Sequence, residues 1–212
     1  MSDKPSSPEV ILASASARRT ELLHQIGVAH RVVPAQVDER RDDGESAEAC
    51  VRRLATSKVL EVQTALMAVT GADAAVGYAV LGADTAVLID DMLLGKPRDR
   101  EHALAMLGRL SGRTHQVLTA VALAATQGVQ CALSRSEVRF RRLSEHERAA
   151  YWDSGEPRDK AGAYAIQGLG AQFVEELRGS YSGVVGLPLF ETARLLSEAG
   201  VPVGRRASRR RG

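Results

Sequence analysis

One acidic side chain stands inside one of the most apolar runs of the chain. Asp84 lies between Leu81 and the run 87–89, Val-Leu-Ile, with small residues on both sides. An unpaired buried carboxylate is costly, and aspartate is depleted in β-strands. A turn at Asp84 would split a run that otherwise reads as one continuous strand, so a purely structural explanation is weak. Asp84 is therefore the strongest single candidate for chemistry.

Two adjacent arginines, Arg18 and Arg19, follow a short apolar strand at 10–12. Apolar residues then recur at helical spacing until Gly27, and Ser16 is the expected N-cap, whose hydroxyl would accept a hydrogen bond from a first-turn amide. Both arginines thus stand at the positive end of the helix dipole, where cations are disfavoured. A bound phosphate would remove the conflict, since amides, hydroxyls and guanidinium groups bind it well. The competing interpretation is that both are solvated surface residues.

A lysine falls on the apolar stripe of the long helix predicted at 46–68, for which Ser46 is the candidate cap. Lys58 follows Leu54 by four residues and precedes Val62 by four. Its stem could lie along apolar surface while its amine stays in water. Alternatively, the amine points into a cleft that the helix borders, and the helix alone does not decide between the two.

The elements that must position these side chains alternate between strand and helix. Asp90-Asp91 indicates a hairpin-type turn, and the spacing of Ser144 and Glu147 indicates a capping box. Elements in this order predict an α/β sandwich with a central sheet. One further strand is predicted from His30 up to the charged loop 38–45. The remaining predicted strands are 78–89, 92–97, 114–126 and 136–143, and the remaining helices are 98–110 (capped by Asp99), 144–155 and 186–200 (starting at Pro188).

Composition allows a substantial core but no general attraction to polyanions. The chain has 212 residues, of which 44% are hydrophobic, and its formal net charge is +2. A chain of this length and composition can bury a proper core. The near-neutral balance lacks the field of a basic nucleic-acid-binding domain, so any phosphate site must be local and no specific nucleic acid is expected.

The two ends of the chain are expected to be disordered, at 1–8 and at the arginine-rich tail 204–212. The first lacks the apolar stretch of a signal peptide, and no run approaches the roughly 18 apolar residues of a membrane span. Cys50 and Cys131 match no metal-binding or redox spacing, and isolated cysteines suit a reducing compartment. These features predict a soluble cytoplasmic protein that does not associate with membranes.

Eight short motifs, taken in order, resemble the Maf family of nucleotide pyrophosphatases, which are relatives of the inosine triphosphate pyrophosphatase fold. The resemblance covers residues 11 to about 199 and implies one catalytic domain at 9–203, with a mixed central sheet flanked by helices and two lobes around a cleft. One departure is Ala17, where the family usually has a proline that would stiffen the turn. The motifs are LASASARRTELL, VDE, LATSK, LGADTAV, GKP, SGRTHQVLTAVAL, DKAGAYAIQGLGAQFV and GSYSGVVGLPL.

The resemblance implies an enzyme that hydrolyses a nucleoside triphosphate to its monophosphate and pyrophosphate. A triphosphate carries about four negative charges, which must be neutralised while a water is positioned. In this reading Ser14, Arg18 and Arg19 hold phosphate oxygens at the helix start. Lys58 and Lys96 add positive charge beside them.

The same resemblance implies a divalent cation at two carboxylates. Asp84 would act as general base or metal ligand, and Glu39, in the VDE motif, would be the second carboxylate at the metal. Hard oxygen ligands of this kind suit Mg²⁺ or Mn²⁺ better than zinc. Which of the two carboxylates takes the proton is left open, and a homodimer is what the family resemblance suggests.

Three positions resemble the subgroup that acts on dTTP and UTP, namely Arg19, Thr85 and Gln167. Gln167 offers both a donor and an acceptor, which can pair with the edge of uracil or thymine. The competing interpretation is that Gln167 only satisfies backbone groups in a glycine-rich turn.

Two other functions compete with pyrimidine hydrolysis. One is a pyrophosphatase for another modified or purine nucleotide, and the other is a non-catalytic, nucleotide-sensing regulator of cell division. The complete set of Asp84, Lys58, Lys96 and Glu39 argues against the sensor, which needs no carboxylate placed for water activation. Nucleic-acid binding through the tail 204–212 ranks last.

Overall fold

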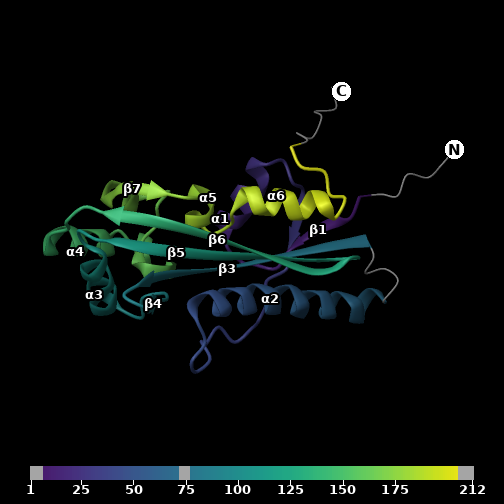
Figure 1. The fold of residues 1–212 in the computed structure, drawn as a ribbon, viewed down its shortest axis with the longest axis horizontal. Helices are drawn as coiled ribbons and strands as arrows, with labels where there is room; N and C mark the ends of the chain where they lie inside the picture. The colour runs from purple at the N-terminus through teal and green to yellow at the C-terminus, as the bar shows by residue number, and fades with distance from the viewer. Residues whose placement is uncertain (1–6, 72–76, 205–212) are drawn as a thin grey trace.

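Residues 7–71 and 77–204, the part of the chain that the computed structural model describes, form a mixed α/β fold around a seven-stranded sheet (Figure 1). The strand order is β2-β1-β3-β5-β6-β7, and β4 pairs with β3 outside this path. β1 pairs in parallel with β2 and β3, whereas the other pairings are antiparallel. The strands are β1 Glu9–Leu12, β2 His30–Val32, β3 Tyr78–Ile89, β4 Met92–Leu94, β5 Thr114–Ala125, β6 Gly128–Phe140 and β7 Val174–Arg178.

Helices cover both faces of the sheet, with α2 on one face and α1, α5 and α6 on the other (Figure 1). The α-helices are α1 Ala17–Gln25, α2 Ala47–Thr70, α3 Arg100–Leu110, α4 Glu145–Asp153, α5 Tyr181–Val185 and α6 Leu189–Glu198. Three short 3₁₀ turns connect α4 to β7, and they are η2 Glu156–Asp159, η3 Ala161–Ala163 and η4 Leu169–Phe173.

The period-two alternation of the strands creates two cores, one on each face of the sheet. On β5, Leu118, Ala120 and Ala122 pack in the cluster that includes the buried stripe of α2. Val117 and Val121 of the same strand belong to the other cluster, which includes residues of α1, α3 and α6. The sheet is therefore buried on both faces along β5, which explains why this strand is almost continuously apolar.

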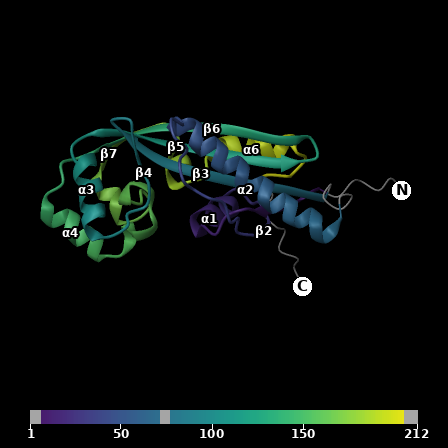
Figure 2. The same cartoon turned by 90° about the horizontal axis from the view of Figure 1, so that it is seen from below.

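The long strands β3, β5 and β6 connect two groups of helices (Figure 2). One group contains α1, α2 and α6 near β1 and β2, and the other contains α3 and α4 near β4 and β7. The expected two-lobed architecture with a mixed sheet flanked by helices agrees with this arrangement. The expectations for the termini concern residues that, apart from 7, 8 and 204, lie outside the described ranges.

Most local predictions at element ends are confirmed. The side chains of Ser46 and Asp99 cap α2 and α3, and Ser144 and Glu147 form both bonds of the capping box at α4. Asp90 and Asp91 have φ angles of 50° and 59°, as a tight hairpin turn requires.

The prediction for Ser16 is wrong in one respect, since it occupies the N-cap position of α1 but its side chain makes no capping hydrogen bond. The amide of Ser16 instead donates to Ser14 Oγ at 3.2 Å. Ser14 also accepts from Arg19 Nη1 at 3.1 Å, so its hydroxyl joins the start of the helix to an arginine of the first turn.

Three elements differ from the predictions. β6 begins at Gly128, eight residues before the predicted strand, because its first half pairs with β5 as far as Ala125 while several of its side chains are exposed. β7 and α5 were not predicted at all.

Among residues 7–71 and 77–204, no helix is both long and apolar enough to cross a membrane.

Candidate active site

A cavity of about 870 Å³ opens beside β3 and is lined by residues of α1 and α2 and by residues of the segment that follows α4. Its lining comes from the β1–α1 junction, the loop before α2, α2 itself, β3, the segment after β4, the start of β5, the turns η2 and η3, and α5. Eight of the nine predicted site residues line this one cavity: Ser14, Arg18, Arg19, Glu39, Lys58, Asp84, Thr85 and Lys96.

Lys58 joins the two predicted carboxylates at the floor of the cavity. Its Nζ lies 2.8 Å from Asp84 Oδ1 and 2.7 Å from Glu39 Oε1. The Lys58 side chain is only 9% exposed, whereas that of Glu39 is 51% exposed. The lysine therefore points into a cleft, and the alternative that it snorkels to solvent is wrong.

Close packing of α2 against β3 explains how Lys58 reaches Asp84. A Cβ on Gly82 of β3 would lie 2.8 Å from Val59 Cγ1 and 3.1 Å from the carbonyl oxygen of Ala55. Only glycine leaves room for the helix at this distance. Gly82 thus brings the backbone of α2 near enough for its lysine to contact a carboxylate two residues farther along the strand.

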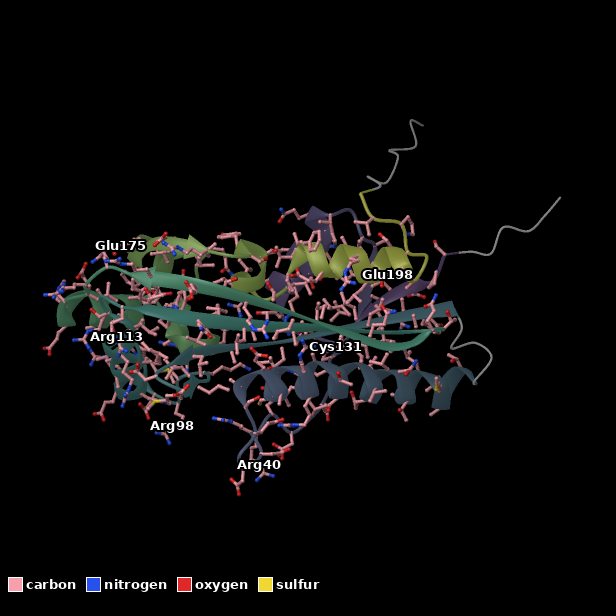
Figure 3. All side chains as sticks on the ribbon, viewed as in Figure 1. Arg40, Arg98, Arg113, Cys131, Glu175 and Glu198 are labelled. Atoms are coloured by element: carbon pink, nitrogen blue, oxygen red, sulfur yellow. The ribbon has the colours of Figure 1, made fainter. Side chains whose placement is uncertain are left out.

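Glu39 reaches the same lysine from the loop that precedes α2. Its neighbours Asp38 and Arg40 pair with each other, with Arg40 Nη2 2.6 Å from Asp38 Oδ2, and Figure 3 shows Arg40 at the tip of the loop, away from the sheet. Glu39 Oε2 also lies 3.8 Å from Lys96 Nζ. The loop thus directs one acidic side chain into the cavity while its neighbours pair outside.

The two carboxylates have opposite electrostatic environments. Burial raises the pKa of Asp84, and the charges of Lys58 and Arg19 oppose this without reversing it. Burial also tends to raise the pKa of Glu39, but the hydrogen bond and charge of Lys58, with Lys96, outweigh it, and the pKa of Glu39 is lowered. Burial therefore dominates at Asp84, whereas the neighbouring ammonium groups dominate at Glu39.

Arg19 is held by the protein through three of its donors. Nε donates to the Gly186 carbonyl at 2.8 Å, Nη1 to Ser14 Oγ at 3.1 Å and Nη2 to Thr85 Oγ1 at 3.4 Å. Its pKa is lowered by burial, against the charge of Asp84. Two of the three positions that resemble the pyrimidine subgroup, Arg19 and Thr85, are thus in direct contact.

Arg18 differs from Arg19, because no described residue accepts a hydrogen bond from its side chain, although it lines the same cavity. Burial lowers its pKa, and the nearby carboxylate of Asp159 opposes that effect. Its guanidinium donors are consequently available to a ligand in the cavity.

The sequence analysis missed three charged residues of the lining, namely Arg41, Asp159 and Lys160. Arg41 lies in the charged loop before α2, and the other two form an ion pair in the small-residue segment after α4. With them, the described lining carries six cationic side chains and three carboxylates. The cavity therefore has an excess of positive charge although the whole chain is nearly neutral.

Gln167 is the one predicted site residue that does not line the cavity. It is exposed on the turn between η3 and η4, whereas Tyr164, three residues earlier, belongs to the lining. Its role in contacting a base stays a prediction, as does the competing role in satisfying the turn.

The acidic side chains of the cavity fit a hard divalent cation only if the substrate and water supply the other ligands. Within the described ranges, no group of three or more histidine, cysteine or acidic side chains is arranged to hold a metal ion. Asp84 and Glu39 nevertheless bring two carboxylates to one ammonium group. Two carboxylates completed by phosphate oxygens and water are the usual protein contribution to a Mg²⁺ site, so the residues present fit such an ion.

A mixed α/β fold with a cationic cavity and a lysine-bridged carboxylate pair defines a site for a polyphosphate that is to be attacked by water. The comparison with known families leads to the same class of protein. The chain matches the Maf-like protein family over residues 9–199 and belongs to that family.

Curated relatives are similar to this chain over nearly their whole length. A protein of Methylococcus capsulatus is 53% identical over 197 residues, which cover 93% of this chain and 94% of the relative. A protein of Methylobacillus flagellatus is 50% identical, covering 92% and 94%, and one of Saccharophagus degradans is 51% identical, covering 93% and 91%. All three relatives are named dTTP/UTP pyrophosphatase.

Proposed function

We propose that this protein hydrolyses dTTP and UTP to the nucleoside monophosphate and pyrophosphate. The observation that carries the proposal is the contact of Lys58 with both Asp84 and Glu39 at the floor of a cationic cavity. The names of relatives about 50% identical over more than nine-tenths of the chain support the same reaction.

The cationic lining binds the triphosphate. Arg18 supplies donors that no described side chain or backbone group occupies, while Lys96, whose side chain is 64% exposed, adds a point charge from the segment after β4. Arg19 is fixed in advance by Gly186, Ser14 and Thr85. A guanidinium held in place loses little side-chain entropy when a phosphate arrives.

Asp84 accepts the proton of the attacking water in this proposal. Its Oδ1 is bound to Lys58, but no described donor contacts Oδ2, which leaves that oxygen for a water molecule. The bond between Oδ1 and Lys58 fixes the orientation of the carboxylate. A hydroxide formed beside it attacks the α-phosphorus, and pyrophosphate leaves with the charges that the cationic lining neutralises.

A divalent cation, Mg²⁺ or Mn²⁺, would be held by Glu39 and Asp84. When bound, it would neutralise phosphate charge and act as a Lewis acid at the phosphoryl oxygens. Lys58 contacts both carboxylates. Its charge favours the ionised form of each, and its hydrogen bonds orient them.

Specificity for pyrimidines rests on less direct support than the reaction does. Arg19 and Thr85 contact each other in the lining of the cavity, and the Thr85 hydroxyl lies 3.0 Å from that of Thr119, so these positions shape the site. Gln167 stands outside the lining. A homodimer and a cytoplasmic location stay predictions.

The test is pyrophosphate release from a panel of dTTP, UTP, CTP, GTP, ATP and modified nucleotides, with Mg²⁺ or Mn²⁺ present. We expect the fastest release from dTTP and UTP. Release confined to a purine or modified nucleotide would retain the reaction and refute the pyrimidine assignment. Binding without release from any nucleotide would favour the sensor.

A further inference from the structure

The segment from η2 to the first residues of η4, residues 156–170, forms one wall of the cavity, and we call it the wall segment. Asp159, Lys160, Ala161 and Tyr164 of this segment line the cavity. Apart from short 3₁₀ turns, it has no regular structure to hold its shape. Its conformation must therefore depend on specific side-chain contacts.

One carboxylate joins the two ends of the wall segment. Glu156, its first residue, accepts the amide of Leu169 at Oε2 over 2.8 Å and the amide of Gly170 at Oε1 over 3.0 Å. Oε1 also accepts from the Tyr151 hydroxyl at 2.7 Å. The Tyr151 hydroxyl in turn accepts from the amide of Ala165 at 3.0 Å. Two side chains thus tie the start, the middle and the end of the segment to α4.

The backbone fits closely around this carboxylate. A Cβ on Gly168 would overlap the carboxylate group of Glu156. A Cβ on Gly170 would lie 2.7 Å from the Tyr151 hydroxyl and 2.8 Å from the Ala165 carbonyl oxygen. Glycine at both positions therefore leaves the space that the Glu156 carboxylate and the Tyr151 hydroxyl occupy.

The carboxylate is ionised in this environment. Burial tends to raise the pKa of Glu156, but the hydrogen bonds from Tyr151 and from the amides of Leu169 and Gly170 outweigh it, and the pKa is lowered. Hydrogen bonds to a charged acceptor are about twice as strong as neutral ones. The hydrogen bonds of Glu156 are therefore strong enough to order the wall segment, which has little regular secondary structure.

We propose that Glu156 is a positioning residue for substrate binding. By closing the wall segment on itself, it fixes Lys160 and Tyr164 along the cavity that receives the triphosphate. The proposal rests on the proposed function of this cavity. Glu156 itself is not among the residues that line the cavity, so it acts through the segment and not by contact with substrate.

The test compares Glu156→Gln with Glu147→Gln. Glutamine keeps the size of the side chain but replaces one acceptor oxygen with a donor that faces backbone N–H groups. Glu147 is a matched control, because its carboxylate accepts the backbone amide of Ser144 at the opposite end of α4 and it does not line the cavity. Tyr151→Phe, which removes one hydroxyl and keeps the ring, is the second variant should Glu156→Gln not fold.

Three measurements are made on each variant. The first is steady-state kinetics with UTP, which gives KM and kcat, and the second is the affinity for a non-hydrolysable UTP analogue with a methylene between the α- and β-phosphates. The third is amide hydrogen exchange at Leu169 and Gly170. For Glu156→Gln we expect faster exchange, a KM and a dissociation constant raised roughly tenfold, and kcat within about threefold of wild type. Tyr151→Phe should shift the same quantities in the same direction by less. Glu147→Gln should leave KM and the exchange at both amides unchanged.

Faster exchange with unchanged KM and unchanged affinity would overturn the proposal, because the ordered wall would then be irrelevant to binding. Unchanged exchange in Glu156→Gln, or an equal rise of KM in Glu147→Gln, would also overturn it. If the wild-type protein binds the analogue but releases no pyrophosphate, the proposed reaction is wrong, and the affinity and exchange data still decide the role of Glu156.

Discussion

The two adjacent arginines, Arg18 and Arg19, differ in their hydrogen-bond partners, which residue type alone does not predict. Arg19 donates to Gly186, Ser14 and Thr85 and so joins α1, β3 and the end of α5. Arg18 faces the cavity with its donors unused by described residues. In the proposed function both arginines bind phosphate, but Arg19 also holds the protein together through its three hydrogen bonds, whereas Arg18 has its donors available for the ligand alone.

Arg18→Ala should raise KM for UTP by about tenfold to a hundredfold, since a hydrogen bond to a charged group contributes about 1.5–3 kcal/mol. Its melting temperature should stay near that of wild type. Arg19→Ala should lower the melting temperature by several degrees as well as weakening binding, because it leaves acceptors without their donor. Steady-state kinetics and thermal unfolding of both variants check this. Equal stability of the two variants would contradict the division of roles.

The sequence identifies the buried carboxylate and its lysine better than the rest of the lining. Asp84 is recognisable because it interrupts an apolar strand, and Lys58 because it interrupts an apolar stripe. Asp159 and Lys160 follow no periodic element, so no local pattern indicates which way they point. Gln167 was proposed from the family resemblance alone, and the structure places it outside the cavity lining.

At the scale of elements, the distance between α2 and β3 decides whether Lys58 can contact Asp84. The long helix carries Lys58, the strand carries Asp84, and Gly82 is the point of closest approach. The site therefore depends on a residue that has no functional group.

Gly82→Ala should destabilise the protein by about 1–3 kcal/mol, because the added methyl would force Val59 and the Ala55 carbonyl away from the strand. Turnover should fall as well, since Lys58 moves with the helix. Gly77→Ala is the control, because a Cβ there meets nothing within 4 Å. Urea unfolding and pyrophosphate release measure both effects. A Gly82→Ala protein with wild-type stability would show that the contact is not tight.

The elements predicted correctly have a clear pattern of apolar residues. α2 and α3 bury regular stripes, and their caps were predicted from single residues, while β5 is apolar along most of its length. β7 is mostly exposed and pairs with the last residues of β6, and α5 has five residues. Their conformations depend on distant partners, which local sequence does not encode.

At the scale of the whole molecule, a buried histidine packs against the wall segment. His115 on β5 is 2% exposed and its Nε2 lies 2.8 Å from the Tyr164 hydroxyl. Its ring stacks edge-on against Tyr164 and Phe140, and Nδ1 has no partner among the described residues. Burial lowers the pKa of His115 from 6.5 to about 4.

This histidine predicts a loss of stability in mild acid. The unfolded chain binds the proton near pH 6.5, whereas the folded protein resists it until about pH 4, so the contribution is complete above pH 6.5 and is lost as the pH falls. Between pH 7 and pH 5 the loss from this group is about 2 kcal/mol. Urea unfolding at both pH values should show a pH dependence smaller by that amount in His115→Gln. Parallel pH dependences of the two proteins would contradict the buried neutral state.

The cavity is lined by segments that lie far apart in the sequence. Arg18 and Lys58 come from α1 and α2, whereas Lys160 and Tyr164 come from the segment that follows α4. This explains why no single short motif identifies the site in the sequence. The motifs identify it only when they are taken together in their order along the chain. Composition suggested a local phosphate site, but only the fold shows that its charges converge.

The most direct test is the identity of the products formed from UTP by the wild-type protein and by Asp84→Asn, with Asp90→Asn, in the turn that follows the same strand, as the control. The account predicts UMP and pyrophosphate from wild type and from Asp90→Asn. It predicts turnover at least a hundredfold lower in Asp84→Asn, with the analogue still bound and the fold intact. Unchanged turnover in Asp84→Asn, or UDP and phosphate as the wild-type products, would contradict it.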